Sequence, residues 1–239
     1  MFLLHILPAL DAPELQKHLV SCVSAIEGKP FDKIYLMQLG TSVLQAEKKF
    51  NDTVGMGGRA LESLIANGRI NALLDLSAVE VSDHALGSIV SAGESRMEAA
   101  GKMGIPQIVA PSCIDGYDVA TWQPLPPRFS GRPLHVHNRL ISALSTTKEE
   151  KAMVGNVMAE KLNKSVGPTA VVIPLQGLSE WDRPGSDLYD PEGIIAFTEA
   201  FKDKIKPEIK VIELDAHLND KIFSDTVLSL FDEMMPKVP

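Results

Sequence analysis

Aromatic residues and cysteines are scarce in this 239-residue chain. Aromatics make up 5% of it, whereas hydrophobic residues of all kinds make up 45%, so we expect a core built mainly from Leu, Ile, Val, Ala and Met. The two cysteines, Cys22 and Cys113, are too few for a disulfide scaffold or a four-cysteine zinc site. No apolar run reaches the roughly 18 residues that a membrane-spanning helix needs. The apolar segment 1–10 lacks a basic region and contains Pro8, so we expect no secretory signal.

Positive charge is also in short supply. The sequence holds 23 Lys and Arg against 31 Asp and Glu, which gives a net charge of −8. A nucleic-acid-binding surface needs clustered Lys and Arg, so we expect no nucleic-acid partner. The large hydrophobic fraction excludes disorder over most of the chain. We therefore predict a cytoplasmic globular protein with neither a membrane nor a nucleic-acid partner.

Short apolar runs alternate with amphipathic windows along the chain. The pattern predicts helices over 11–27, 57–67, 82–90, 94–103, 147–163, 191–204 and 220–235, and strands over 33–39, 70–76, 107–110, 134–137, 169–173 and 209–214. Residues 112–132, rich in Pro, Gly and Asp, are predicted to form a long loop. Such alternation is typical of right-handed βαβ units. We predict a single α/β domain over residues 1–239: a Rossmann-like, doubly wound, mostly parallel sheet with helices on both faces.

A glycine-rich turn leads into the predicted helix at 57–67. In open α/β sheets ligands bind beyond the carboxyl ends of the strands, and turns of this kind lie there. Gly55, Gly57 and Gly58 would let backbone N–H groups approach an anion, and Arg59 would clamp a phosphate or carboxylate. The alternative is a tight turn with a solvated Arg59. The spacing matches neither the dinucleotide fingerprint nor a Walker loop.

Two further turns are candidate anion contacts. Ser91, Gly93 and Arg96 stand at a predicted helix start, and Gly177 and Ser179 follow the predicted strand 169–173. Backbone N–H groups, a hydroxyl and a guanidinium could each bind an anion there. The alternatives are a helix cap followed by a surface Arg, and an ordinary loop.

Acidic and histidine side chains follow other predicted strands. Asp75 ends the strand 70–76 and could hold a ribose, a metal or a proton, or could only cap the next helix; Glu80, Asp83 and His84 come next. After the predicted strand 209–214 come Asp215 and His217, followed by Asn219. A carboxylate and an imidazole placed so close together could act as a general acid and base. The alternative there is a capped helix with a surface histidine.

A histidine pair and a cysteine complete the candidates. His135 and His137 share one face of a predicted strand, a spacing seen in metal sites, but no further metal motif is present. We therefore predict no metal site and regard His137 and Asn138 as hydrogen-bonding ligand residues. Cys113 could be a nucleophile, although nothing nearby in the sequence activates it and a buried inert thiol is commoner.

Eight short motifs in one order resemble a known family. They are Gly55 to Glu62, Leu74 to Leu76, Ser91 to Gly93 with Arg96, Gly104 to Gln107, Val136 to Asn138, Ile173 to Gly177 with Ser179, Tyr189 to Pro191, and Asp215 to Asp220. Together they resemble the carboxyl-terminal half of the Tm-one-like ATP-binding family, an uncharacterised family of bacteria, fungi and plants. The resemblance covers about residues 55–231, and residues 1–51 diverge from it.

The resemblance implies a nucleotide ligand and a partner. ATP with magnesium is the cofactor it implies. Family members usually carry two α/β halves, so we expect either a homo-oligomer or a partner that carries the amino-terminal half. Met56 stands where the family usually has Thr, which removes a hydroxyl from the glycine-rich turn.

We predict from these observations that the chain binds a small anionic ligand or nucleotide at the carboxyl ends of its strands. Two other classes stay open. One is a hydrolase or lyase that acts on a carboxylate or phosphate substrate, with His217 and Asp215 as acid and base. The other is an interaction or regulatory subunit that needs a partner half.

Overall fold

The computed structural model describes residues 57–235. The chain separates into two compact units, Met1–Val54 and Gly55–Pro239, and the described residues belong to the second. Gly55, Met56, and the helix and strand predicted over 11–27 and 33–39 lie outside them. A single domain over residues 1–239 stays a prediction.

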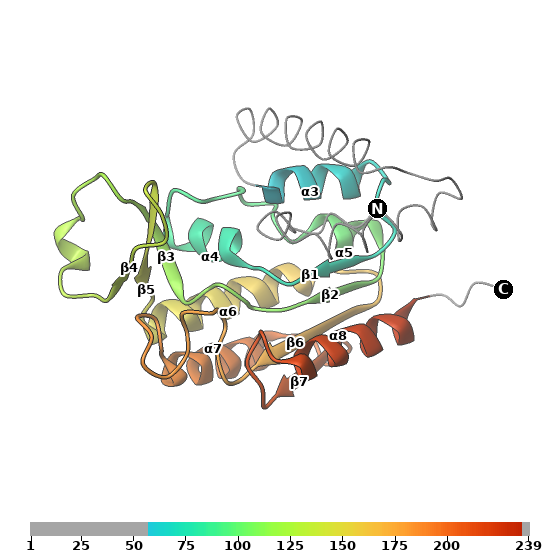
Figure 1. The fold of residues 1–239 in the computed structure, drawn as a ribbon. Coiled ribbons are helices and arrows are strands. Elements are labelled where there is room, and N and C mark those ends of the chain that lie inside the picture. Colours follow the sequence, from blue (N-terminus) through green and yellow to red (C-terminus); the bar gives the residue numbers. More distant parts are fainter. Residues whose placement is uncertain (1–56, 236–239) are drawn as a thin grey trace, which may run out of the picture. The chain divides into compact units, whose positions relative to one another are not determined.

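A parallel four-stranded sheet forms the centre of the described unit (Figure 1). Its strands are β1 (Leu73–Asp75), β2 (Gln107–Val109), β6 (Thr169–Pro174) and β7 (Lys210–Leu214), in the order β1-β2-β6-β7. Every neighbouring pair is parallel. All six residues of β6 are buried, as expected for an inner strand covered on both faces. The four strands predicted over 70–76, 107–110, 169–173 and 209–214 are confirmed.

Helices cover both faces of this sheet. Helices α6 (Lys148–Leu162) and α7 (Pro191–Lys204) pack on one face, and α8 (Lys221–Met234) packs on the other. Successive strand residues point to opposite faces: Val171 contacts the α6 and α7 side, whereas Val172 contacts the α8 side. The predicted α/β class, with a parallel sheet and helices on both faces, is confirmed. No helix between residues 57 and 235 combines the length and apolarity needed to cross a membrane.

The helix caps follow the sequence signals. Thr147 and Glu150 form the predicted capping box: the Thr147 hydroxyl accepts from the Glu150 N–H at 3.2 Å, and the Glu150 carboxylate accepts from the Thr147 N–H at 2.9 Å. Asp190 caps α7 by accepting from the Gly193 N–H. The remaining described helices are α3 (Gly57–Ala66), α4 (Val79–Leu86) and α5 (Ala99–Met103). Helices α4 and α5 are therefore shorter than, or displaced from, the windows predicted at 82–90 and 94–103.

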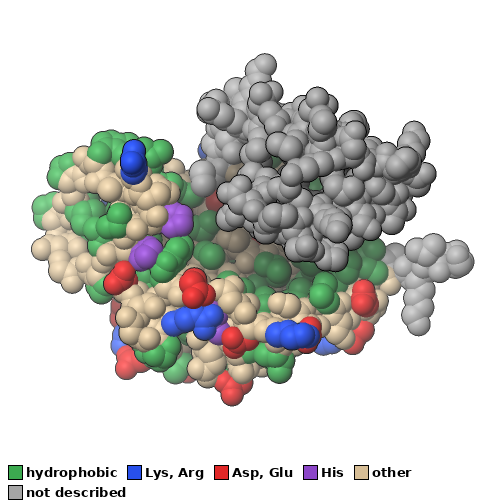
Figure 2. Space-filling model, viewed as in Figure 1, with side chains coloured by type: hydrophobic (Ala, Val, Ile, Leu, Met, Phe, Trp, Pro, Cys, Tyr) green, Lys and Arg blue, Asp and Glu red, His purple; other side chains and the backbone are tan. Residues whose placement is uncertain are grey.

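The long loop predicted over 112–132 is wrong in part, because a second sheet begins there. Strands β3 (Gly116–Ala120), β5 (Ile141–Ser145) and β4 (Leu134–His135) form an antiparallel sheet in the order β3-β5-β4, with the short 3-10 helix η2 (Pro127–Phe129) between β3 and β4. Gly116 and Asp118 of β3 are of residue types depleted in strands, and the pairing of β3 with the distant β5 supplies its hydrogen bonds. The surface of this sheet is rich in apolar side chains (Figure 2).

Candidate anion-binding site

Two turns that lie far apart in the sequence meet at the start of α3. The Arg59 side chain donates from Nε to the Ala92 carbonyl at 3.2 Å and from Nη2 to the Ser91 carbonyl at 3.5 Å. The Ser91 hydroxyl accepts from the Gly93 N–H at 3.0 Å and lies 2.8 Å from His84 Nδ1. The structure thus brings together Arg59, His84 and Ser91, hereafter the Arg59 group. His84 had only a weak sequence signal, its place in an acidic stretch after β1.

Arg96 lies beside this group but is fully engaged. Its five N–H groups meet five acceptors: both Asp75 carboxylate oxygens, Glu80 Oε2, Glu62 Oε1 and the Ser77 carbonyl. Only 3% of Arg96 is exposed. Burial alone would lower the pKa of Arg96, but the carboxylates of Asp75 and Glu80 raise it above its ordinary value. Arg96 therefore has no N–H to offer a ligand, and Asp75 serves as its ion-pair partner.

A carboxylate of the protein itself lies so close to Gly58 that no larger residue fits at this position. Its N–H donates to Glu80 Oε1 at 2.8 Å, and a Cβ atom there would lie 1.8 Å from Glu80 Oε2. Glu62 similarly accepts from the N–H groups of Met97 at 2.6 Å and Ala99 at 2.8 Å. Each carboxylate thus meets N–H groups near a helix start, where negative charge is favoured. These internal pairings leave Arg59 as the exposed cation of the turn, with no carboxylate partner between residues 57 and 235.

The structure does not join Asp215 to His217. His217 is 2% exposed: its Nδ1 accepts from the Asn219 N–H at 3.0 Å, and its Nε2 lies 2.9 Å from the Ser179 carbonyl. Because Nδ1 accepts, Nε2 carries the proton and donates to that carbonyl. Asp215 instead accepts from the Gln176 amide at 2.6 Å. His217 thus fastens two loops together, and this geometry does not favour the acid and base roles.

Gly177 and Ser179 belong to the loop that His217 holds in place. A Cβ atom on Gly177, whose φ is 140°, would lie 2.3 Å from the His217 ring. The Ser179 hydroxyl donates to the buried Asp115 carboxylate at 2.5 Å. Burial raises the pKa of Asp115 to about 6, against the Ser179 hydrogen bond, which lowers it. Both residues therefore have internal partners at the carboxyl end of β6.

The buried Asp83 of α4 is joined to the half-buried Asp118 of β3. Asp83 Oδ1 accepts from the Asp118 N–H at 3.3 Å, and the Ser88 hydroxyl lies 2.8 Å from Asp83 Oδ2 and 2.5 Å from the Asp118 carbonyl. Burial, and next the charge of Asp118, raise the pKa of Asp83 to about 8. Asp83 is thus protonated at neutral pH. This pair lies one residue from His84, and sequence reasoning could not find it because Asp118 fell in the predicted loop.

His135 and His137 both pack against the ring of Trp181. The ring centroids of His135 and His137 lie 4.4 Å and 5.0 Å from that of Trp181, and 6.5 Å from each other. His135 Nδ1 is 3.0 Å from Asp187. Across the described part of the chain, no three or more His, Cys, Asp and Glu side chains are grouped so that they could hold a metal ion.

Asn138 and Cys113 have local roles. The Asn138 side chain accepts from the N–H groups of Leu140 at 2.7 Å and Ile141 at 2.9 Å, which closes the turn between β4 and β5. Burial, and next the charge of Asp115, raise the pKa of the Cys113 thiol to about 11. A thiol with a raised pKa is a poor nucleophile at neutral pH.

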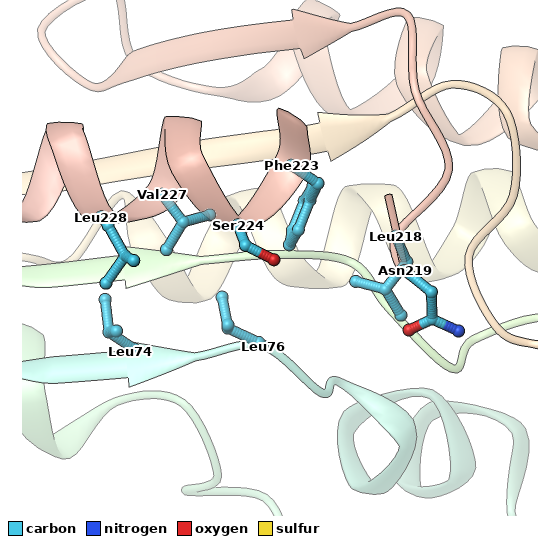
Figure 3. Close-up of a pocket in the computed structure, with 8 residues that line it drawn as sticks. All are labelled: Leu74, Leu76, Leu218, Asn219, Phe223, Ser224, Val227 and Leu228. Carbon is cyan, nitrogen blue, oxygen red and sulfur yellow. The ribbon is translucent and has the colours of Figure 1, made fainter. Parts of the chain in front are cut away.

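A hollow of about 390 Å³ lies between β1 and α8 (Figure 3). Its walls are formed by Leu74, Leu76, Leu218, Asn219, Phe223, Ser224, Val227 and Leu228. Asn219 reaches it but donates its side-chain amide to Glu180 at 2.8 Å. None of the lining residues carries a charge, so this hollow does not suit an anion. Of the predicted site residues, those of the Arg59 group are the ones whose exposure and charge suit an anionic ligand.

Comparison with known proteins identifies the family. The domain described as "Uncharacterised protein family (UPF0261) C-terminal domain" matches residues 42–235. The chain belongs to this family. A UPF0261 protein of Brucella melitensis is 40% identical over 178 residues, which are 74% of this chain and 43% of that protein.

Two other relatives extend the family's range. A UPF0261 protein of Clostridium tetani is 36% identical over 232 residues, 95% of this chain and 56% of that protein. The "ToMV resistance protein Tm-1" of Solanum lycopersicum is 33% identical over 187 residues, 77% of this chain and 24% of that protein. The resemblance drawn from the eight motifs is thus confirmed. This UPF0261 chain spans about half the length of its bacterial relatives, and the Clostridium match takes in most of residues 1–51.

Proposed function

We propose that this UPF0261 chain binds a small anionic ligand at the Arg59 group. The observation that carries the proposal is the meeting of two turns: Arg59 Nε lies 3.2 Å from the Ala92 carbonyl, and Ser91 Oγ lies 2.8 Å from His84 Nδ1. A guanidinium, an imidazole and a hydroxyl are thereby gathered on one exposed surface. These three groups are the usual side-chain partners of phosphate and carboxylate oxygens.

The donors of the Arg59 group support binding of a phosphate-sized anion. Arg59 uses Nε and Nη2 on carbonyl oxygens, and its Nη1 has no partner between residues 57 and 235. Those two contacts hold the planar guanidinium in place, so less side-chain entropy is lost when a ligand binds. His84 is exposed, and in its protonated form it adds a second positive charge beside Arg59.

The buried acidic cluster under the site is compatible with this proposal. Asp75 and Glu80 are paired with Arg96 at 2.5 Å and 2.8 Å, and Glu80 also accepts from Gly58 at the start of α3. The negative charges of Asp75 and Glu80 are thus balanced by internal partners, so these two carboxylates repel an anionic ligand at Arg59 less. We extend the proposal to ATP with magnesium, which the family resemblance implies. We also propose that the further length of the bacterial relatives includes a half that contributes to the whole protein's activity.

Melting curves of the full chain test this site. The probes are inorganic phosphate, ATP, and ATP with magnesium, each measured with wild type, Arg59→Ala and the control Arg69→Ala. Arg69 is exposed just after the other end of α3. A probe at about 100 times its dissociation constant adds about 2.7 kcal/mol of stability.

We expect the wild type and Arg69→Ala to shift equally and Arg59→Ala to lose the shift. A shift with ATP but not with phosphate would assign the site to a nucleotide. Equal shifts in all three proteins, or no shift with any probe, would contradict the proposal.

A further inference from the structure

Charge is unevenly distributed between residues 119–147, which hold most of the small antiparallel sheet but not Asp118 of β3, and the rest of the described unit. Residues 119–147, hereafter the β arm, hold three Arg and no Asp or Glu. The other described residues hold 14 Lys and Arg against 25 Asp and Glu. A basic arm thus belongs to an acidic body, although the whole chain has a net charge of −8.

The end of the β arm exposes large apolar side chains. Trp122, Val136 and Leu140 are 64%, 62% and 62% exposed, and apolar side chains cover much of this region in Figure 2. The Thr121 N–H donates to the Leu140 carbonyl at 3.1 Å, so Trp122 and Leu140 lie at the same end of the sheet. Arg139, also exposed, stands next to Leu140. Trp and Arg beside aliphatic side chains are the typical composition of a protein–protein contact.

The body carries a groove of opposite character between α7 and β7. It has a volume of about 560 Å³ and is lined by Leu175, Ile195, Thr198, Glu199, Lys202, Asp203 and Glu213. Ile195 is 56% exposed, which supplies an apolar floor. Lys202 pairs with Glu213, whereas Glu199 and Asp203 have no ion-pair partner in residues 57–235.

We propose that the β arm of one copy binds the α7–β7 groove of a second copy of this chain. Trp122 and Leu140 would cover Leu175 and Ile195, and Arg139 would meet Glu199 or Asp203. Because both surfaces belong to the same chain, a twofold arrangement makes the contact twice. Charge complementarity between a basic arm and an acidic groove would steer association and fix its register.

A protein partner suits the arm better than a nucleic acid does. Two of its three Arg are already engaged: Arg132 pairs with Glu150 at 2.7 Å, and Arg128 lies over the Phe129 ring at 4.6 Å. Arg139 alone remains for a partner, whereas binding a phosphate backbone needs several cations. The exposed apolar side chains of the arm match instead the apolar floor of the groove, formed by Leu175 and Ile195.

Sedimentation of the full chain with a charge-exchange pair tests the proposal. The variants are Arg139→Glu, Glu199→Arg and their combination, with Arg69→Glu as a control outside both surfaces. All of these side chains are exposed, so the variants should keep the wild-type melting temperature. We expect the wild type to sediment at twice the mass of the 25.9 kDa chain.

Each single reversal should raise the dimer dissociation constant about tenfold or more, and the combination should restore it. Raised salt should weaken the wild-type dimer. A wild type that stays monomeric, or a dimer insensitive to both reversals, would overturn the proposal. A monomer that binds double-stranded DNA through Arg139 would also overturn it and identify a nucleic acid as the arm's partner.

Discussion

Arg96 and Asp75 are joined by two hydrogen bonds inside the protein, at 2.5 Å from Nη1 to Oδ2 and at 2.7 Å from Nη2 to Oδ1. The pair links the turn before α5 to the end of β1. Glu80 of α4 and Glu62 of α3 bind the same guanidinium, so one side chain holds four segments of the chain together. The anion that Arg96 binds is therefore the protein's own.

Replacing Arg96 by Met should strongly destabilise the protein. The substitution leaves the carboxylates of Asp75 and Glu80 buried without their cation, and breaking a buried ion pair costs about 3–5 kcal/mol. Urea unfolding of Arg96→Met and of the control Arg69→Met would measure the difference. A loss below about 1 kcal/mol would mean that the cluster is not held by Arg96.

Gly58→Ala should destabilise the protein, and Gly57→Ala should not. A Cβ atom at position 58 would lie 1.8 Å from the Glu80 carboxylate and 2.6 Å from Arg96 Nε, whereas one at position 57 would meet no atom of residues 57–235 within 4 Å. Overpacking of a buried site costs about 1–3 kcal/mol, and Ala is otherwise the better helix former. Thermal melts of the two variants, which share the same chemical change, decide the point. Equal melting temperatures would contradict the close approach of Glu80.

Asp83→Asn should change how stability depends on pH. The pKa of Asp83 in the folded protein is about 8, above its ordinary value of 3.8. Its protonated form therefore contributes stability that is fully present below pH 3.8 and is lost as pH rises through about 8. A neutral amide does not titrate, so the variant should gain stability relative to wild type as pH rises.

Urea unfolding at pH 5 and at pH 8 would measure this change, with Asp232→Asn, an exposed carboxylate, as the control. His137 lies close enough to lower the pKa of Asp118 against the effect of burial. A His137→Ala variant, measured alongside, separates its charge from that of the pair. Parallel pH profiles for wild type and Asp83→Asn would show that Asp83 is ionised in the folded protein.

The main sheet could be predicted from the sequence because its signals are local. The apolar run of β6 is buried along its whole length, and Thr147 and Glu150 form a capping box with each other. The antiparallel sheet could not be predicted in the same way. Residues 116–120 of β3 become a strand only through pairing with β5, 21 or more residues further along the chain, and no local pattern reports such a partner.

The candidate site divides in the same manner. The glycine-rich segments at 57–58 and 91–93 do meet, through the Arg59 side chain and the Ala92 carbonyl, but of Gly57, Gly58 and Gly93 only Gly58 is closely approached by described atoms. What approaches Gly58, however, is Glu80, and what approaches Gly177 is the ring of His217. A sequence shows that a position needs glycine, but it does not show whether a ligand or the protein's own side chain fills the space.

His217 is the residue on which the hydrolase alternative depends, and His217→Gln distinguishes fastening from acid–base chemistry. His217 is 2% exposed, and both of its ring nitrogens are hydrogen-bonded to backbone groups of other residues, Ser179 and Asn219. Removing them leaves the buried Ser179 carbonyl without its partner, which costs about 1–3 kcal/mol, and also frees the part-buried Asn219 N–H. We therefore expect a lower free energy of unfolding for His217→Gln, and little change for Asp215→Asn, whose side chain is bonded to an exposed amide.

Urea unfolding measures both variants, and the Arg59 group should still bind its anion in each. A His217→Gln protein as stable as wild type would show that the imidazole is not needed for the fold and would reopen a chemical role for it.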